Sequence, residues 1–208
     1  MTISKHIHSC LLVKENGLDV LIDPGNFTYE EKGLDLDNLG KLDYMLITHE
    51  HADHMHVPFI REILKKFPSV KIITNPSAAE ILKKEGIDAG TDAVQGIALS
   101  ETHHEKIFGM TVPQNVQFSI FNKLTHPGDS LHFNLYTHVL ALPLQAPWGS
   151  LTEAVEYALS LKPQVIIPIH DWHWNEKARE SFYQRLEKFF GENDIDFKSL
   201  KTGEEVTI

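Results

Sequence analysis

Four histidines within residues 49–56 directly follow a short apolar run, and this arrangement constrains the chain more than any other feature of its sequence. The run Tyr44-Met45-Leu46-Ile47 has the length and composition of a strand buried on both faces. The polar segment that follows, residues 48–54, reads Thr-His-Glu-His-Ala-Asp-His. Polar side chains at the end of a buried strand are a common arrangement for a functional site.

The spacing inside this segment indicates metal binding. His49 and His51 are two residues apart, so on an extended chain they project to the same side and can reach one ion. Asp53 and His54 come where the chain turns toward the next helix, and they can hold a second ion nearby. The segment therefore predicts a two-metal site.

Composition favours one domain in a reducing compartment. The 208 residues are 42% hydrophobic, enough for a large core, and we expect a single domain over residues 1–208. Cys10 is the only cysteine, which excludes an internal disulfide and fits a cytoplasmic protein. Because Cys10 lies in an apolar run, we interpret it as a small buried side chain rather than a nucleophile.

Charge and hydropathy disfavour large anionic partners. The N-terminus lacks the apolar region of a signal peptide, and no apolar run approaches the roughly 18 residues that span a bilayer. A net charge of −10 without a stretch rich in lysine or arginine disfavours nucleic acid and anionic membranes as partners. Bound cations would reverse the field in one pocket, so a small anionic substrate is still compatible. The sequence does not predict the oligomeric state.

Apolar periodicity predicts strands that alternate with helices along the chain. Asn16-Gly17 is typical of a tight hairpin between two opening strands. Further strands are expected at residues 44–48, 70–74, 97–100, 116–121, 139–142 and 165–169, and a possible edge strand at 197–208. Helices are expected over about 58–67, 75–86, 151–161 and 175–190, with a capping box at Ser150-Leu151-Thr152-Glu153. This order predicts a layered α/β architecture.

The segment from Thr48 to His54 resembles the Thr-His-x-His-x-Asp-His signature of the metallo-β-lactamase superfamily of metal-dependent hydrolases. The resemblance extends over roughly residues 3–175. Within the superfamily, the chain is most similar to the small, lactonase-like and largely uncharacterised branch. This resemblance implies an αβ/βα sandwich of two packed sheets with helices outside. Asp23, in Ile-Asp-Pro-Gly, resembles the aspartate that orients metal ligands from behind.

The resemblance also implies the remaining ligands. Asp129 resembles the aspartate that bridges both ions, and His170 resembles the last histidine. The third histidine of the first ion is either His103 or His104, and we favour His104. The implied set is then His49, His51 and His104 on one ion, and Asp53, His54 and His170 on the other, with Asp129 between them.

The implied cofactors are two divalent ions, with zinc favoured and manganese or iron also suited to imidazole and carboxylate ligands. The implied activity is hydrolysis of a small ester, lactone, amide or phosphodiester by a hydroxide bridging the metals, with Asp53 also accepting a proton from the attacking water. The alternative function is a non-catalytic or metal-depleted binding module. A diiron redox protein is disfavoured because a glutamate is expected at the position of His51.

The other histidines are not predicted to be ligands. Four of them lie in strand-like or loop contexts without ligand spacing and are interpreted as surface or packed residues: His6, His8, His132 and His138. His56 and His126 adjoin motif residues and are expected behind the ligands or facing the substrate. Trp148, Trp172 and Trp174 could either wall a pocket or pack in the core.

Overall fold

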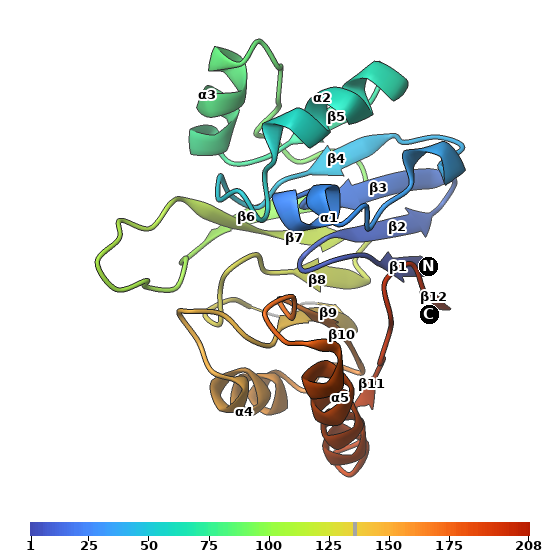
Figure 1. Ribbon diagram of the computed structural model, residues 1–208, viewed down its shortest axis with the longest axis vertical. Helices are drawn as coiled ribbons and strands as arrows, with labels where there is room; N and C mark the ends of the chain where they lie inside the picture. The colour runs from blue at the N-terminus through green and yellow to red at the C-terminus, as the bar shows by residue number, and fades with distance from the viewer. Residues whose placement is uncertain (135–136) are drawn as a thin grey trace.

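The computed structural model describes residues 1–134 and 137–208 and contains two six-stranded mixed sheets (Figure 1). The first sheet has the order β12-β1-β2-β3-β4-β5. Its strands are β1 (Thr2–Lys5), β2 (Leu11–Glu15), β3 (Leu18–Ile22), β4 (Tyr44–Leu46), β5 (Lys71–Ile73) and β12 (Glu205–Thr207). The second sheet has the order β11-β10-β9-β8-β7-β6. Its strands are β6 (Ile97–Thr102), β7 (Asn115–Ile120), β8 (Leu124–His126), β9 (Val139–Pro143), β10 (Val165–Ile169) and β11 (Asp196–Phe197).

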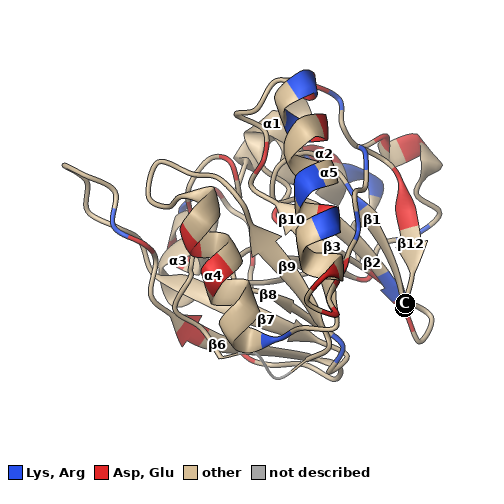
Figure 2. Ribbon diagram, turned by 90° about the horizontal axis from the view of Figure 1, so that it is seen from below, with Lys and Arg blue, Asp and Glu red and all other residues tan. Residues whose placement is uncertain are grey.

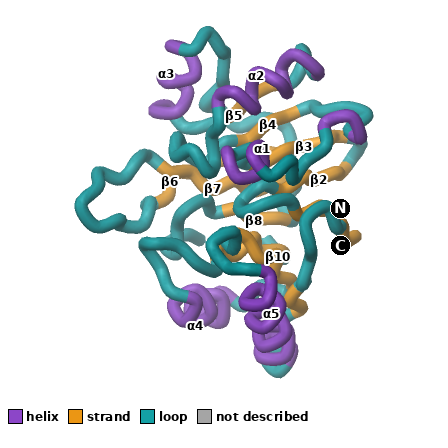
Figure 3. The backbone as a smooth tube through the Cα atoms, viewed as in Figure 1, coloured by secondary structure: helices purple, strands orange, loops and turns teal. Residues whose placement is uncertain are grey.

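Helices lie outside both sheets, as Figures 1 and 3 show. The first sheet is covered by α2 (Val57–Lys66) and α3 (Pro76–Lys84), and the second by α4 (Leu151–Leu161) and α5 (Glu176–Gly191). Two short helical segments, α1 (Asn26–Glu30) and the 3-10 helix η1 (Leu36–Asn38), join β3 to β4. The two packed sheets with helices outside are the αβ/βα arrangement that the sequence resemblance implies.

Strand alternation divides the apolar residues among three cores. Val13 and Val20 of the first sheet face Phe118 and Ile167 of the second. The opposite faces of the same sheets pack under the helices. Met45 of the first sheet packs in the core beneath α2, and Leu140 and Ile166 of the second sheet pack in the core beneath α4 and α5. Successive strand residues point to opposite faces, so one apolar run supplies two layers.

Strand direction gathers the chemistry at one edge of the molecule. In the first sheet β1, β3, β4 and β5 run in one direction, and in the second sheet β6, β8, β9 and β10 do. Ligand sites of α/β sheets lie beyond the carboxyl ends of such strands. The segments that leave these ends carry most of the predicted site residues.

The sequence-based elements agree with the structure apart from several short segments. The opening hairpin is β2 and β3, but β1 precedes it and pairs with β12. The segment Leu124–His126 was not predicted as a strand, because three residues give no periodicity to detect. The segment 26–30 forms α1, where no helix was expected. The expected strand in the C-terminal tail is present as β12, and β11 adds a second short strand.

Charge is mixed over the helical surface. Figure 2 shows basic and acidic residues interspersed, with both signs along α5. Within the described ranges, none of the helices has the length and apolar character needed to cross a membrane.

Candidate metal centre

Seven predicted ligands meet beyond the carboxyl ends of the parallel strands. His49, Asp53 and the rest of the motif follow β4, Asp129 follows β8, and His170 follows β10 directly. Their imidazole nitrogens and carboxylate oxygens form two groups, and within each group these atoms lie within 4.8 Å of one another. One group is His49, His51, His104 and Asp129, and the other is His8, Asp53, His54 and His170.

The first group is held by three histidines. Nδ1 of His51 lies 3.1 Å from Nε2 of His49 and 3.3 Å from Nε2 of His104. Two nitrogens bound to one tetrahedral zinc at about 2.05 Å each would be about 3.3 Å apart, so these separations fit a shared ion. His104 is buried, whereas the neighbouring His103 is exposed and lies outside the group.

Asp129 stands between the two groups. Its Oδ1 lies 2.8 Å from Nε2 of His170 and 3.0 Å from Nε2 of His54. Its Oδ2 faces the first group, 3.6 Å from Nε2 of His104. One carboxylate thus presents an oxygen to each group, which is the arrangement that a bridging ligand requires.

The second group brings several imidazole lone pairs together in a buried space. Nε2 of His54 and Nε2 of His170 are 3.2 Å apart. Nδ1 of His54 lies 2.7 Å from Asp23, and Nδ1 of His170 lies 3.1 Å from the backbone oxygen of Gln145. These acceptors fix the Nδ1 atoms as donors, so in each neutral ring Nε2 carries a lone pair. The lone pairs converge with Asp129, and either protons or a metal ion must neutralise them.

The close approach of imidazoles and carboxylates also shifts the pKa values of His54 and Asp129. Burial alone would lower the pKa of His54, but the charges of Asp129 and Asp23 outweigh burial and hold this pKa well above its usual value. Burial would raise the pKa of Asp129, yet the charges of His170 and His54 hold it well below the usual range. Metal binding would replace the protons on these imidazoles.

Further residues fix the rings from behind. Asp23 accepts hydrogen bonds from the backbone N–H and the hydroxyl of Thr48, both at 2.8 Å, and from His54. Nδ1 of His104 contacts the backbone oxygen of Glu105. Such partners orient metal ligands and raise their basicity. The predicted position of Asp23 behind the ligands is therefore the one observed.

His8 is the site residue that the sequence interpretation missed. It is 1% exposed, its Nε2 lies 3.1 Å from Asp53, and its ring centroid is 3.8 Å from that of His170. Burial and the neighbouring His170 lower its pKa to about 3, so the ring is neutral. The position of His8 could have indicated its role, because His8 follows the carboxyl end of β1 just as the predicted ligands follow the carboxyl ends of other strands.

Three residues of the site have a left-handed backbone conformation, which several turn residues elsewhere in the chain share. His8, Asp23 and His170 have φ values of 62°, 45° and 59°. Non-glycine residues adopt this left-handed region rarely and at a cost, and such residues gather at functional sites. Gly25 is required for a different reason, since a Cβ there would lie 1.8 Å from the backbone oxygen of Asp53.

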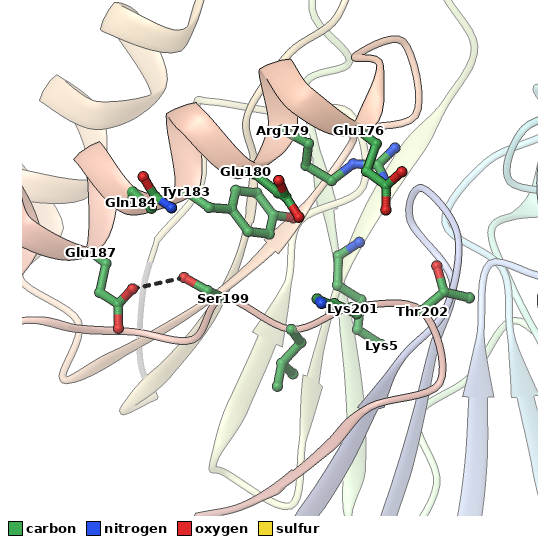
Figure 4. Close-up of a pocket in the computed structure, with 11 residues that line it drawn as sticks. Lys5, Glu176, Arg179, Glu180, Tyr183, Gln184, Glu187, Ser199, Lys201 and Thr202 are labelled. Carbon is green, nitrogen blue, oxygen red and sulfur yellow. Dashed lines mark hydrogen bonds between the residues drawn. The ribbon is translucent and has the colours of Figure 1, made fainter.

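A buried ionic network behind His170 anchors the strand end that carries it. Asp171 is contacted by Nζ of Lys5 at 3.1 Å, by Nε of Arg179 at 3.2 Å and by the hydroxyl of Tyr183 at 2.5 Å. Burial would raise the pKa of Asp171, but the charges of Lys5 and Arg179 outweigh burial and lower it. Figure 4 shows Lys5, Arg179 and Tyr183 at a pocket between α5 and residues 199–202, and none of the predicted ligands lines this pocket.

The remaining predicted non-ligands occupy several environments. His126 is buried behind the ligands, with Nε2 3.0 Å from the backbone oxygen of Ser9. His6 is buried against the backbone oxygen of Gly33, and His132 and His138 are exposed. Trp148 both walls the cavity over the ligands and donates from Nε1 to Asp129 at 2.8 Å.

Residues 2–170 match the protein-family model described as the beta-lactamase superfamily domain. The chain belongs to the metallo-β-lactamase superfamily of metal-dependent hydrolases. Protein Rv0786c of Mycobacterium tuberculosis is 29% identical over 96% of both chains. A UPF0173 metal-dependent hydrolase of Koribacter versatilis is 30% identical over 76% of this chain and 78% of its own. The structure of Igni18, a metallo hydrolase from Ignicoccus hospitalis, covers 100% of this chain and 97% of its own with a TM-score of 0.73 and 22% identity.

Proposed function

We propose that this superfamily member is a dinuclear hydrolase that cleaves a small ester, lactone, amide or phosphodiester. The observation that carries the proposal is the position of Asp129, which turns one carboxylate oxygen toward each of two histidine groups. A single structural ion would not need a second group of converging lone pairs. Two ions would therefore use His49, His51 and His104 on one side and Asp53, His54 and His170 on the other.

Zinc is the metal we favour, because the set is rich in imidazole and carboxylate donors, and manganese and iron suit the same donors. Two divalent ions held by these residues would supply an activated water nucleophile and polarise the oxygen of the substrate. Side chains of the protein would move the proton and orient the reacting groups.

Asp53 is the residue placed to move the proton. Its side chain is 25% exposed and lines the open cavity, whereas Asp129 is nearly buried at 3%. A carboxylate with both a ligand contact and access to the cavity can accept the proton of an attacking water. His8, as a neutral donor from Nε2, would contact Oδ2 of Asp53, the same oxygen that faces His54 and His170, and would fix the direction of the carboxylate.

The substrate would enter through a cavity of about 310 Å³ directly over these groups. Asp53, Asp129 and His170 form its floor. Its size is at the lower end for ligand sites and suits a small molecule, so the proposed partners include a small substrate but neither nucleic acid nor membrane.

Elemental analysis of the purified chain, followed by a panel of chromogenic esters, lactones and phosphodiesters with added zinc or manganese, tests the proposal. We expect about two ions per chain and turnover of at least one substrate class. Two ions without turnover of any substrate would favour a binding module, and one ion per chain would contradict the dinuclear site.

A further inference from the structure

The loop between β6 and β7, residues 103–114, carries the most exposed large apolar side chains among the described residues. Phe108 is 91% exposed and Met110 is 60% exposed. Figure 1 shows this loop extending away from the body of the sandwich. Exposure of a phenylalanine forgoes the stabilisation that its burial would give, and exposed apolar groups that gather near one site mark a binding surface.

The loop is anchored at both of its ends. The N–H of Glu105 donates to the backbone oxygen of Asp129 at 2.9 Å, next to the ligands. At the other end, Nδ2 of Asn75 donates to the backbone oxygen of Gln114 at 2.9 Å. Between these anchors the N–H of Met110 donates to the oxygen of Ile107, which closes a turn with Phe108 at its tip.

The same turn forms part of the cavity over the metal centre. Ile107 and Met110 line this cavity together with the ligands Asp53, Asp129 and His170. Its remaining walls include Phe27, Pro147 and Trp148. The cavity therefore has a polar floor, which would carry the ions, and apolar side chains on the loop side and along part of its flanks, where Asn26 and His173 also lie.

The apolar flanks make packing and hydrogen-bond contacts of their own. Phe27 stacks on Trp172 with ring centroids 3.8 Å apart and planes within 7°. Trp148 is fixed by its hydrogen bond to Asp129. An apolar wall that is already held by such contacts can select a ligand by shape beside a polar floor.

We infer that the substrate carries a hydrocarbon arm next to its hydrolysable group, and that this arm lies between the Phe27 and Trp148 walls and the turn at Ile107 and Met110. Phe108, at the exposed tip of the same turn and outside the lining of the cavity, contacts an arm that is long enough to extend beyond the cavity. The inference rests on the proposed function and narrows its substrate to amphiphilic esters, lactones or amides with an apolar arm next to the bond that is cleaved.

Continuity with the cavity favours this occupant over a second copy of the chain. Met110 contributes both to the exposed tip and to the lining of the cavity, so an arm leaving the metal floor meets it directly. A dimer contact centred on Phe108 would not explain why Ile107 and Met110 line the cavity over the predicted ligands. The net charge of −10 disfavours an anionic membrane as the occupant.

A series of alkyl hydroxamates from acetohydroxamate to octanohydroxamate tests the inference by calorimetric titration of the zinc-loaded protein. The hydroxamate group binds metal ions, and the alkyl tail reports on the apolar walls. We expect affinity to rise about threefold to fourfold per methylene until the cavity is filled. In the double variant Phe108→Ser with Met110→Ser, octanohydroxamate affinity should fall at least about tenfold while acetohydroxamate affinity stays unchanged.

Phe189→Ser on α5 is the matched control, because Phe189 is also exposed, at 41%, but lies on another element. Affinity independent of chain length, or an equal loss in the control, would overturn the inference. A dimer in sedimentation that dissociates in Phe108→Ser would overturn it as well and assign the loop to self-association.

Failure of the proposed function gives a different result. In that case acetohydroxamate itself would not bind and no ester would be hydrolysed. The loop can then still be tested on the metal-free protein with the apolar dye anilinonaphthalene sulfonate. The inference requires that its fluorescence enhancement fall in the double variant and persist in Phe189→Ser, and unchanged fluorescence in the double variant would contradict it.

Discussion

Nε2 of His8 lies 3.1 Å from a carboxylate oxygen of Asp53, although 45 residues separate them in the chain. The contact joins the turn after β1 to the histidine motif after β4. The ring of His8 also packs on His170 at 3.8 Å between centroids. His8 therefore restrains two residues of the same proposed ion site.

We predict that His8→Asn weakens binding of the second ion by about tenfold to a hundredfold, the usual effect of losing a partner behind a ligand. Asparagine tolerates the left-handed backbone at this position, with φ 62°, but is too short to reach Asp53. Titration against a competing chelator measures the change. His138→Asn, at an exposed histidine, is the control, and an unchanged affinity in His8→Asn would remove His8 from the site.

Chelation should abolish hydrolysis and lower the melting temperature. Ions that bind only the folded state stabilise it by mass action, by about 4 kcal/mol when their concentration is a thousand times Kd. Calorimetry of the protein before and after dialysis against a chelator measures the shift, and re-addition of zinc should restore it. Full activity after exhaustive dialysis would exclude the metal mechanism.

The histidine motif made much of the site predictable because its ligands are adjacent in the chain. Residues 48–54 contribute four of the side chains that the structure brings together, and the two-residue spacing already indicated that His49 and His51 project to the same side. Asp129 and His170 could be proposed only through resemblance, since nothing local to either residue indicates which distant strands become neighbours.

His8 escaped prediction for a physical reason. Its role depends on β1 running parallel to β3 and β4, and that direction is set by pairing across the whole sheet. Periodicity predicts a strand but not its neighbours, so an isolated histidine after a strand has no visible partner. The short strand β8 and the helix α1 were missed because they contain only three and five residues.

Lys5→Met should lower the free energy of unfolding by about 3 kcal/mol, because it removes the ammonium group that pairs with the buried carboxylate of Asp171. Arg179 and the hydroxyl of Tyr183 still contact Asp171, so the loss should stay near the lower end for a broken buried pair. Urea unfolding of the metal-free protein measures it. Lys14→Met, on the exposed side of β2, should change stability by less than about 0.5 kcal/mol.

Cys10 predicts a specific alkaline loss of stability. Burial raises the pKa of its thiol far above the unfolded value of about 8.5, so the unfolded chain releases this proton first and stability falls as pH rises above that value. Between pH 8.5 and 10 the wild type should lose about 1.5 kcal/mol more than Cys10→Ala. Urea unfolding of both proteins across this range provides the comparison. Parallel curves, or rapid alkylation of the native thiol, would show that Cys10 is accessible.

The adjacent histidines after β6 offer the sharpest test of the ligand assignment. His104 is buried with Nε2 3.3 Å from His51, whereas His103 is exposed, because adjacent residues on an extended chain point to opposite sides. We predict that His104→Ala lowers occupancy of the ion held by His49 and His51, and that His103→Ala keeps metal content near two per chain. Metal titration of the two single variants decides between them. If His103→Ala is the variant that loses an ion, the assignment of His104 is wrong.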